Sequence, residues 1–260
     1  MDYRNNAVLY EAVEDIPGEK AMFRKAAEII TAFAQRTEEI SGKGIALLDL
    51  CCGTAPMYKY LPGLIKCPLE EITGVDIDDN YLRFARQKYW ERVTGMGADW
   101  LGVELNFINH DAVDYTHPAL VDIILASSAY HHIEDERKLR FLEKVRAQLK
   151  DEGIAIFCEN LIGKYQNPAE RAVAVTDFYA ERIKEMARLG TTDRRLGLVC
   201  RVLQYELDRE YEWKHSYSEF VDNLCKAGLV VVNKTKVWPI EDLFKDLKVG
   251  DFVFEVRKNA

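Results

Sequence analysis

The stretch LLDLCCGTAP, residues 47–56, decides how this chain is expected to fold. It begins with an apolar run typical of a buried strand, with Asp49 near the end of that run. A turn containing Gly53 follows, and Pro56 suits the first turn of a helix, where the missing N–H of proline costs little. In a parallel sheet, such a strand–turn–helix unit presents backbone N–H groups to a ligand beyond the end of the strand.

Outward from this stretch, the spacing of apolar residues predicts the remaining elements. Strands are expected at residues 71–77, 104–110, 121–127, 153–160, 229–238 and 251–258, and helices at 19–40, 81–93, 134–150 and 216–228. The third of these helices is expected to stop at residues 151–153. Residues 167–210 also have helical spacing and are predicted to cover the carboxyl edge of the sheet. Strands that alternate with helices predict a parallel sheet with helices on both faces.

Composition narrows the classes of function. A net charge of −8 argues against broad attraction to nucleic acid or to an anionic membrane. The six cysteines form no CxxC pair and are expected to be reduced, and no run approaches the ~18 apolar residues of a membrane span. The N-terminal residues lack the pattern of a signal peptide, so the expected location is the cytoplasm. Two adjacent histidines without a HExxH or CxxC pattern predict no metal site.

The turn after the first strand carries a family resemblance. Asp49, Cys51, Gly53 and Ala55 stand at alternate positions, as do the acid and the glycines in the first motif of class I S-adenosylmethionine-dependent methyltransferases, which this segment resembles. Cys51 replaces the first glycine, and we expect its backbone to keep a conformation that L-residues adopt readily. A dinucleotide fingerprint needs glycine at positions 51, 53 and 56, so a nicotinamide-dependent oxidoreductase ranks last.

The resemblance extends in register over roughly residues 40–160 and implies the cofactor contacts. Asp76, at the end of the second strand, would accept hydrogen bonds from the ribose hydroxyls of S-adenosylmethionine. Asp111 and Ala112 would hold the adenine edge beside the apolar Ile77. S-adenosylhomocysteine would be the product. The predicted cofactor-binding residues are Asp49, Cys51, Gly53, Thr54, Asp76, Ile77, Asp111, Ala112 and Ser127.

The same resemblance implies an architecture. It is a Rossmann-like class I methyltransferase fold, an α/β fold with a seven-stranded, mostly parallel sheet, helices on both faces and a helical cap inserted after the fifth strand. We expect one domain over residues 1–260. It divides into an N-terminal helical segment, a cofactor-binding core, the cap, and a C-terminal helix with the last two strands; these are residues 1–40, 41–160, 161–215 and 216–260.

Few residues need be catalytic, because the sulfonium already activates the methyl group. Tyr130 and His131, at the exit of the fourth strand, are the candidates for contact with the acceptor, and His131→Ala tests a general-base role for His131. His132 is expected to be structural. The cap carries cations and aromatic residues that fit an anionic or aromatic small molecule, namely Arg194, Arg195, Arg201, Tyr205, Tyr211 and Trp213.

The predicted function is methyl transfer to a small-molecule acceptor by direct displacement. The adenine-methylating NPPY signature is absent, which disfavours DNA, and no membrane partner is expected; a homodimer stays open. A weaker likeness to carboxy-S-adenosylmethionine synthases rests on residues 16–18, the helical insertion and residues 227–229, although Glu19 stands where that family has an aromatic residue. The sequence is also compatible with a cyclising enzyme and with a non-catalytic cofactor-binding partner protein.

Overall fold

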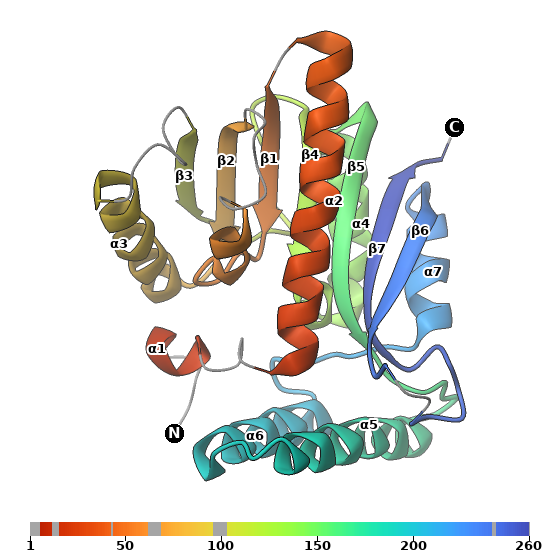
Figure 1. The fold of residues 1–260 in the computed structure, drawn as a ribbon. Helices are drawn as coiled ribbons and strands as arrows, with labels where there is room; N and C mark the ends of the chain where they lie inside the picture. Colours follow the sequence, from red (N-terminus) through yellow and green to blue (C-terminus); the bar gives the residue numbers. More distant parts are fainter. Residues whose placement is uncertain are drawn as a thin grey trace.

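The computed structural model describes residues 6–11, 16–42, 44–61, 69–95, 103–240 and 243–259. Within these residues, seven strands form one sheet in the order β3-β2-β1-β4-β5-β7-β6 (Figure 1). The strands are β1 (Ile45–Leu50), β2 (Leu69–Asp76), β3 (Glu104–Asn109), β4 (Val121–Ser127), β5 (Leu149–Leu161), β6 (Leu229–Trp238) and β7 (Gly250–Lys258). Strands β1 to β5 pair in parallel, and β7 is antiparallel to both of its neighbours. The expected mostly parallel sheet is confirmed.

Helices cover both faces of this sheet. They are α1 (Ala7–Tyr10), α2 (Pro17–Ser41), α3 (Asp79–Gly95), α4 (Asp135–Gln148), α5 (Pro168–Arg188), α6 (Asp193–Asp208) and α7 (Tyr217–Lys226), with 3-10 turns η3 (Pro56–Tyr60) and η5 (Tyr130–His132). Helices α2 and α3 share one hydrophobic cluster, and α4 and α7 share the cluster on the opposite face. None of the helices in the described ranges is both long enough and apolar enough to span a membrane.

The inner strands are apolar on both sides, which explains their continuous hydrophobic runs. Leu47 packs with the α2 and α3 cluster, whereas its neighbour Leu48 packs with the α4 and α7 cluster. Ile123 and Ile124 of β4 divide in the same way. Successive side chains of a strand point to opposite faces, so a strand buried on both faces has no polar side.

The boundary between α4 and β5 differs from the expectation. The helix ends at Gln148, and residues 149–153 belong to the strand rather than to a turn. Leu149 pairs with Val121, and the register then shifts before Ile154 pairs with Ile123. Pairing with β4 therefore places residues 149–153 in a strand, although their local sequence favours a helix end.

Helices α5 and α6 lie across one edge of the sheet, at the carboxyl ends of β1 to β5 (Figure 1). Each begins with a side-chain cap: Asn167 accepts the N–H of Glu170, and Thr192 accepts the N–H of Arg195. Their inner faces form a separate hydrophobic cluster that includes Phe178. These helices form a cap over the edge at which parallel sheets of this type bind ligands.

Candidate functional site

The turn after β1 has an unusual backbone. Cys51, Gly53 and Ala55 all have positive φ angles, of 60°, 54° and 53°. The expectation that Cys51 keeps an ordinary backbone conformation is therefore wrong: the turn imposes the left-handed region on alternate residues, whether or not they are glycine. At Gly53 an added Cβ would lie 3.3 Å from the ring of Tyr10.

Asp76 is held rigidly beside this turn. Its Oδ2 accepts the backbone N–H of Gly53 and its Oδ1 accepts the N–H of Asp78, both at 2.8 Å. Burial raises the pKa of Asp76, while these two N–H groups oppose the shift. Because each carboxylate oxygen can accept a second hydrogen bond, the side chain can still bind a ligand with two neighbouring hydroxyl groups.

A large cavity of about 660 Å³ opens over this turn. Its wall contains six of the nine predicted cofactor-binding residues: Cys51, Gly53, Asp76, Ile77, Asp111 and Ala112. The remaining wall residues are Tyr10, Asp78, Tyr81, Ser128, His132, Ile133, Glu134, Arg137, Tyr211 and Trp213. The structure thus brings together residues that follow β1, β2, β3 and β4.

An apolar and an acidic side chain shape this large cavity. The side chain of Ile77 is 72% exposed, although it is apolar, and it gives this cavity an apolar wall. Arg137 lies 2.6 Å from Asp111 Oδ2. Burial pushes the pKa of Asp111 up, but the hydrogen bonds from Arg137 and the Val113 N–H, together with the nearby positive charge, outweigh burial and lower the pKa. The Asp111 carboxylate is therefore ionised and already paired.

Three predicted cofactor-binding residues lie outside the large cavity. The hydroxyl of Thr54 donates to Glu11 at 2.5 Å. Asp49 and Ser127 instead line a second, small cavity of about 80 Å³. Burial raises the pKa of Asp49 to about 8, so this carboxyl is largely protonated at neutral pH. The carboxyl ends of strands bring residues to one edge, but the direction of each side chain depends on its packing.

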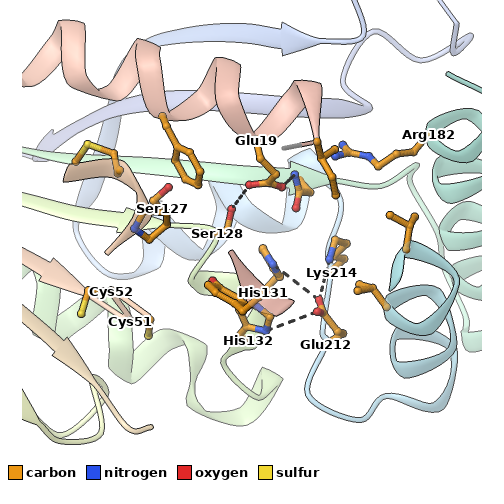
Figure 2. A pocket seen from close by; sticks show the side chains of 18 of the residues that line it. Glu19, Cys51, Cys52, Ser127, Ser128, His131, His132, Arg182, Glu212 and Lys214 are labelled. Atoms are coloured by element: carbon orange, nitrogen blue, oxygen red, sulfur yellow. Dashed lines mark hydrogen bonds and ion pairs between the residues drawn. The ribbon is translucent and has the colours of Figure 1, made fainter. Parts of the chain in front are cut away.

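The small cavity lies between the sheet edge and the cap (Figure 2). Its wall comprises Tyr10, Ile16, Glu19, Phe23, Asp49, Cys51, Cys52, Pro56, Met57, Ser127, Ser128, His131, His132, Asn160, Phe178, Tyr179, Arg182, Val199, Val202, Glu212 and Lys214. Four residues line both cavities, so the two adjoin there: Tyr10, Cys51, Ser128 and His132. Glu19 accepts a hydrogen bond from the Ser128 hydroxyl at 2.8 Å.

The cations at the small cavity are not those that the sequence singled out. Arg194 and Arg201 are exposed on α6. Arg182 of α5 reaches the cavity instead, where it pairs with Asp251 and lies 4.3 Å from the centre of the Trp238 ring. The second cation is Lys214. Tyr211 and Trp213 do line a cavity, the large one.

Tyr130 does not reach either cavity, contrary to its expected contact with an acceptor. It is completely buried in the α4 and α7 cluster, and its hydroxyl accepts a hydrogen bond from Asn223 at 3.0 Å. Burial raises the pKa of Tyr130. The short η5 turn sends Tyr130 into the core and the two histidines toward the cavities.

The imidazole rings of His131 and His132 each have one close oxygen partner at Nδ1. His131 Nδ1 lies 2.8 Å from Glu159 Oε2, and His132 Nδ1 lies 2.8 Å from the carbonyl oxygen of Tyr211. Burial lowers the pKa of His131, with Lys214 adding to the effect, so its imidazole is neutral. His131 Nε2 faces Glu212 rather than open space, which disfavours the general-base role.

Glu212 is the residue that sequence reasoning missed. It follows α6 in the cap, and no motif spacing points to it. Burial alone would raise its pKa, but Lys214 and the two histidines outweigh this effect and lower the pKa to about 2. Among the described residues, His131, His132 and Glu212 have ligand atoms that all lie within 4.8 Å of one another.

The comparison with known families finds a match for the central part of the chain. Residues 47–153 match the model of a family described as a methyltransferase domain. The small RNA 2′-O-methyltransferase of Schizosaccharomyces pombe is 28% identical over 107 residues, which cover 40% of this chain. The match spans only 28% of the length of that protein.

Solved structures resemble the fold over nearly the whole chain. Magnesium protoporphyrin IX methyltransferase from Synechocystis PCC 6803, with bound S-adenosylhomocysteine, covers 100% of this chain and is itself covered to 97%, with a TM-score of 0.58 and 12% identity. The plantazolicin methyltransferase BpumL has a TM-score of 0.58 and 17% identity, with 97% of this chain and 90% of that chain covered. At identities this low, the TM-scores and the coverage show that the fold is shared.

Proposed function

We propose that this chain is an enzyme that binds S-adenosylmethionine and transfers its methyl group to a small molecule. The match of residues 47–153 to a methyltransferase-domain family and the fold shared with methyltransferases of known structure support this proposal. S-adenosylhomocysteine would be the product. The large cavity would hold the cofactor, and the small cavity would hold the reacting part of the acceptor.

The observation that carries this proposal is the position of Asp76. Its carboxylate lies at the end of β2 on the wall of the large cavity, and two backbone N–H groups hold it in one orientation. A carboxylate held in this way suits two ribose hydroxyls, since charge-assisted hydrogen bonds are about twice as strong as neutral ones. The exposed side chain of Ile77 would pack against the adenine ring beside Asp111.

The meeting point of the two cavities would be the position of the reacting methyl group. Cys51, Ser128 and His132 line both cavities, so a sulfonium near Cys51 would direct its methyl group into the small cavity. The chain's own contribution is alignment and exclusion of water, since the sulfonium supplies the activated methyl group. His131 would contact the acceptor from the wall of the small cavity.

A small molecule is the preferred acceptor class. The small cavity is roofed by the cap and lies in a protein whose net charge of −8 is unfavourable for a polyanionic acceptor. Two of the similar structures are methyltransferases named for plantazolicin and for magnesium protoporphyrin IX. The protein of S. pombe is named for small RNA, so RNA is the alternative acceptor that an experiment should compare with small molecules.

Calorimetric titration with S-adenosylmethionine tests the proposal. Ligand-free wild-type protein should bind one equivalent, and Asp76→Ala should weaken binding by about 1–3 kcal/mol because a charged hydrogen-bond partner is lost. Asp79→Ala is the matched control, because Asp79 is exposed in the first turn of α3 and lies outside the large cavity. Circular dichroism must show that both variants are folded.

Failure of folded, ligand-free wild-type protein to bind S-adenosylmethionine would refute the proposed function. Equal affinity in Asp76→Ala and Asp79→Ala would refute the role of Asp76 alone. Mass spectrometry of products from acceptor pools then separates methylation from carboxylation or cyclisation of the cofactor. Cofactor binding without a product from any pool would favour a non-catalytic binding protein.

A further inference from the structure

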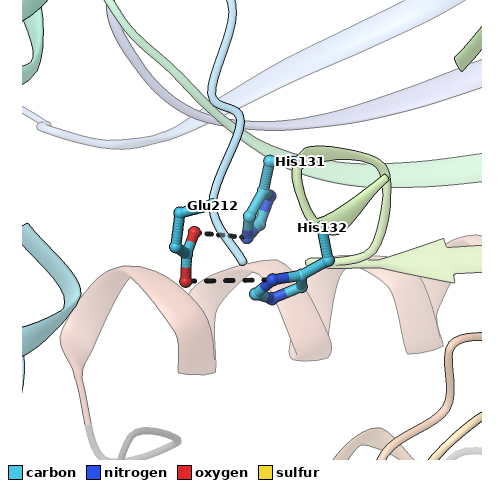
Figure 3. Close-up of side chains that lie close together, drawn as sticks. All are labelled: His131, His132 and Glu212. Carbon is cyan, nitrogen blue, oxygen red and sulfur yellow. Dashed lines mark ion pairs between the residues drawn. The ribbon is translucent and has the colours of Figure 1, made fainter. Parts of the chain in front are cut away.

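Two segments that are distant in sequence converge at the small cavity. His131 and His132 come from the η5 turn after β4, and Glu212 comes from the segment after α6 (Figure 3). His131 Nε2 lies 3.8 Å from Glu212 Oε2, and His132 Nδ1 lies 3.8 Å from Glu212 Oε1. We call these three residues the His-His-Glu cluster.

The outer contacts of the cluster orient its ligand atoms. His131 Nδ1 lies 2.8 Å from Glu159 Oε2, and Nε2 faces Glu212. With the hydrogen on Nδ1, the lone pair of Nε2 is available to a cation. Glu159 is itself held, because its Oε1 accepts the N–H of Tyr130 at 2.9 Å. A carboxylate behind a histidine is the usual arrangement at metal sites, where it fixes the tautomer and the ring orientation.

Glu212 is oriented from the other side. Lys214 Nζ lies 2.8 Å from Glu212 Oε2, and Oε1 is directed toward His132. The N–H of Trp213 donates to the carbonyl oxygen of His131 at 2.7 Å and so ties the two segments together. Both His131 and Glu212 are at least nine-tenths buried. The cluster is therefore built into the fold.

The distances fit a cation better than a direct pair. A separation of 3.8 Å between ring nitrogen and carboxylate oxygen exceeds the length of a hydrogen bond. Ligand atoms about 2.1 Å from a tetrahedral ion lie about 3.4 Å apart. The two histidine–carboxylate distances would have to shorten by a few tenths of an ångström, and the widest separation in the cluster, within 4.8 Å, by up to about 1.4 Å.

We propose that the His-His-Glu cluster binds one divalent transition-metal ion and that the acceptor carries a hydroxyl group that binds beside it. Two imidazoles and a carboxylate suit such ions, and three protein ligands leave an open position. His132 lines both cavities, so the open position lies where the methyl group would arrive. The choice of acceptor rests on the proposed function; the metal site does not.

The ion would act as a Lewis acid and lower the pKa of the acceptor hydroxyl. The hydroxyl proton passes to water, the oxygen forms a bond to the methyl carbon, and the carbon–sulfur bond breaks with its electron pair kept on sulfur. This path needs no general base from the protein, in agreement with the orientation of His131 Nε2 toward Glu212.

Binding of the ion should change the tautomer of His132. Its Nδ1 lies 2.8 Å from the carbonyl oxygen of Tyr211 and so carries a hydrogen. Coordination by Nδ1 moves this hydrogen to Nε2 and exchanges the hydrogen bond for a bond to the metal. Nitrogen-15 NMR of the imidazole with diamagnetic Zn²⁺ should show the change, and a His132 ring that Zn²⁺ leaves unaltered would overturn its place among the ligands.

Titration of chelator-treated, full-length protein with Co²⁺ alone tests the metal site. One equivalent should bind and give visible absorption bands, and Glu212→Gln and His132→Ala should each lower the affinity at least about 10-fold. Glu210→Gln is the matched control, because Glu210 is an exposed acid in the same segment. Glu212→Gln preserves shape, and circular dichroism checks its folding.

Catechol, as a probe hydroxyl compound, should shift the Co²⁺ bands of the wild-type protein by taking the open position. No stoichiometric Co²⁺ binding, or binding that survives both substitutions, would overturn the metal site. Bands that catechol leaves unchanged would overturn the hydroxyl acceptor. Titration with S-adenosylmethionine in the presence of chelator is independent of the cluster, so it tells failure of this site from failure of the proposed function.

Discussion

At the scale of single residues, the turn after β1 is strained. Cys51 and Ala55 have positive φ angles of 60° and 53°, in the region that costs an L-residue about 1–2 kcal/mol. Gly53, between them, adopts the same region without that cost. The turn aims the N–H of Gly53 at Asp76, so the strain accompanies the geometry of the proposed cofactor site.

Gly53→Ala should lower both stability and cofactor affinity. The added Cβ at a φ of 54° lowers the free energy of unfolding by about 1–2 kcal/mol, and it would lie 3.3 Å from the Tyr10 ring on the cavity wall. Gly42→Ala is the control: Gly42 has a φ of 65°, but a Cβ there meets nothing within 4 Å. Urea unfolding should show similar destabilisation of Gly53→Ala and Gly42→Ala. Calorimetry should show weaker binding of S-adenosylmethionine in Gly53→Ala only. Equal affinities would contradict the placement of the cofactor.

Asp49 should make stability depend on pH. Burial raises its pKa from 3.8 to about 8 in the folded protein, so its favourable contribution is complete below the unfolded pKa and is lost as the pH rises toward 8. Asp49→Asn removes this dependence. The wild-type protein should lose stability relative to Asp49→Asn by up to about 1.4 kcal/mol per pH unit between pH 4 and 8, measured by urea unfolding. A constant difference would contradict the raised pKa.

At the scale of elements, the cap depends on a buried ion pair between its helices. Arg171 of α5 pairs with the Glu206 carboxylate of α6 and donates to the carbonyl oxygen of Lys214 at 3.0 Å. Arg171 and Glu206 are both buried, and Lys214 lies 3.6 Å from the same carboxylate. This network connects the two helices to the segment that carries Glu212.

Arg171→Met should destabilise the protein by about 3–5 kcal/mol, because it leaves Glu206 buried with less compensation. Adding Glu206→Gln should recover part of that loss. Lys184→Met on the same helix is the control, since Lys184 pairs with Glu181 at an exposed position and should change stability by less than about 1 kcal/mol. Urea unfolding measures all three. A double variant no more stable than Arg171→Met would contradict the argument from buried charge.

At the scale of the whole molecule, the proposed cofactor site lies at the edge of the sheet, where residues that follow several strands meet the cap. S-adenosylmethionine at 100 times its dissociation constant should therefore stabilise the folded protein by about 2.7 kcal/mol. For a chain of this size the melting temperature should rise by about 5–10 °C, measured by scanning calorimetry. NAD at the same concentration should produce no shift. A shift with NAD would instead favour a dinucleotide-binding protein.

The order of strands and helices was predictable because it depends on local signals. Apolar runs buried on both faces mark the strands, and amphipathic spacing marks the helices, so each predicted element lies close to its expected position, whereas the short helix α1 was not predicted. The end of α4 was wrong because pairing between β4 and β5 extends the strand over residues that locally favour a helix end. The positive φ of Cys51 was missed because its cause is the path of the turn rather than the type of residue.

By itself, the sequence determined the sheet, the turn that follows β1 and the acid at the end of β2, since these depend on periodicity and turn chemistry within short segments. Only the tertiary structure decided which side chains face a ligand. It turned Tyr130 into the core and His131 toward the small cavity, within one short turn. It also brought Glu212 from the cap to the histidines, because contacts between distant segments depend on how the cap packs across the sheet edge.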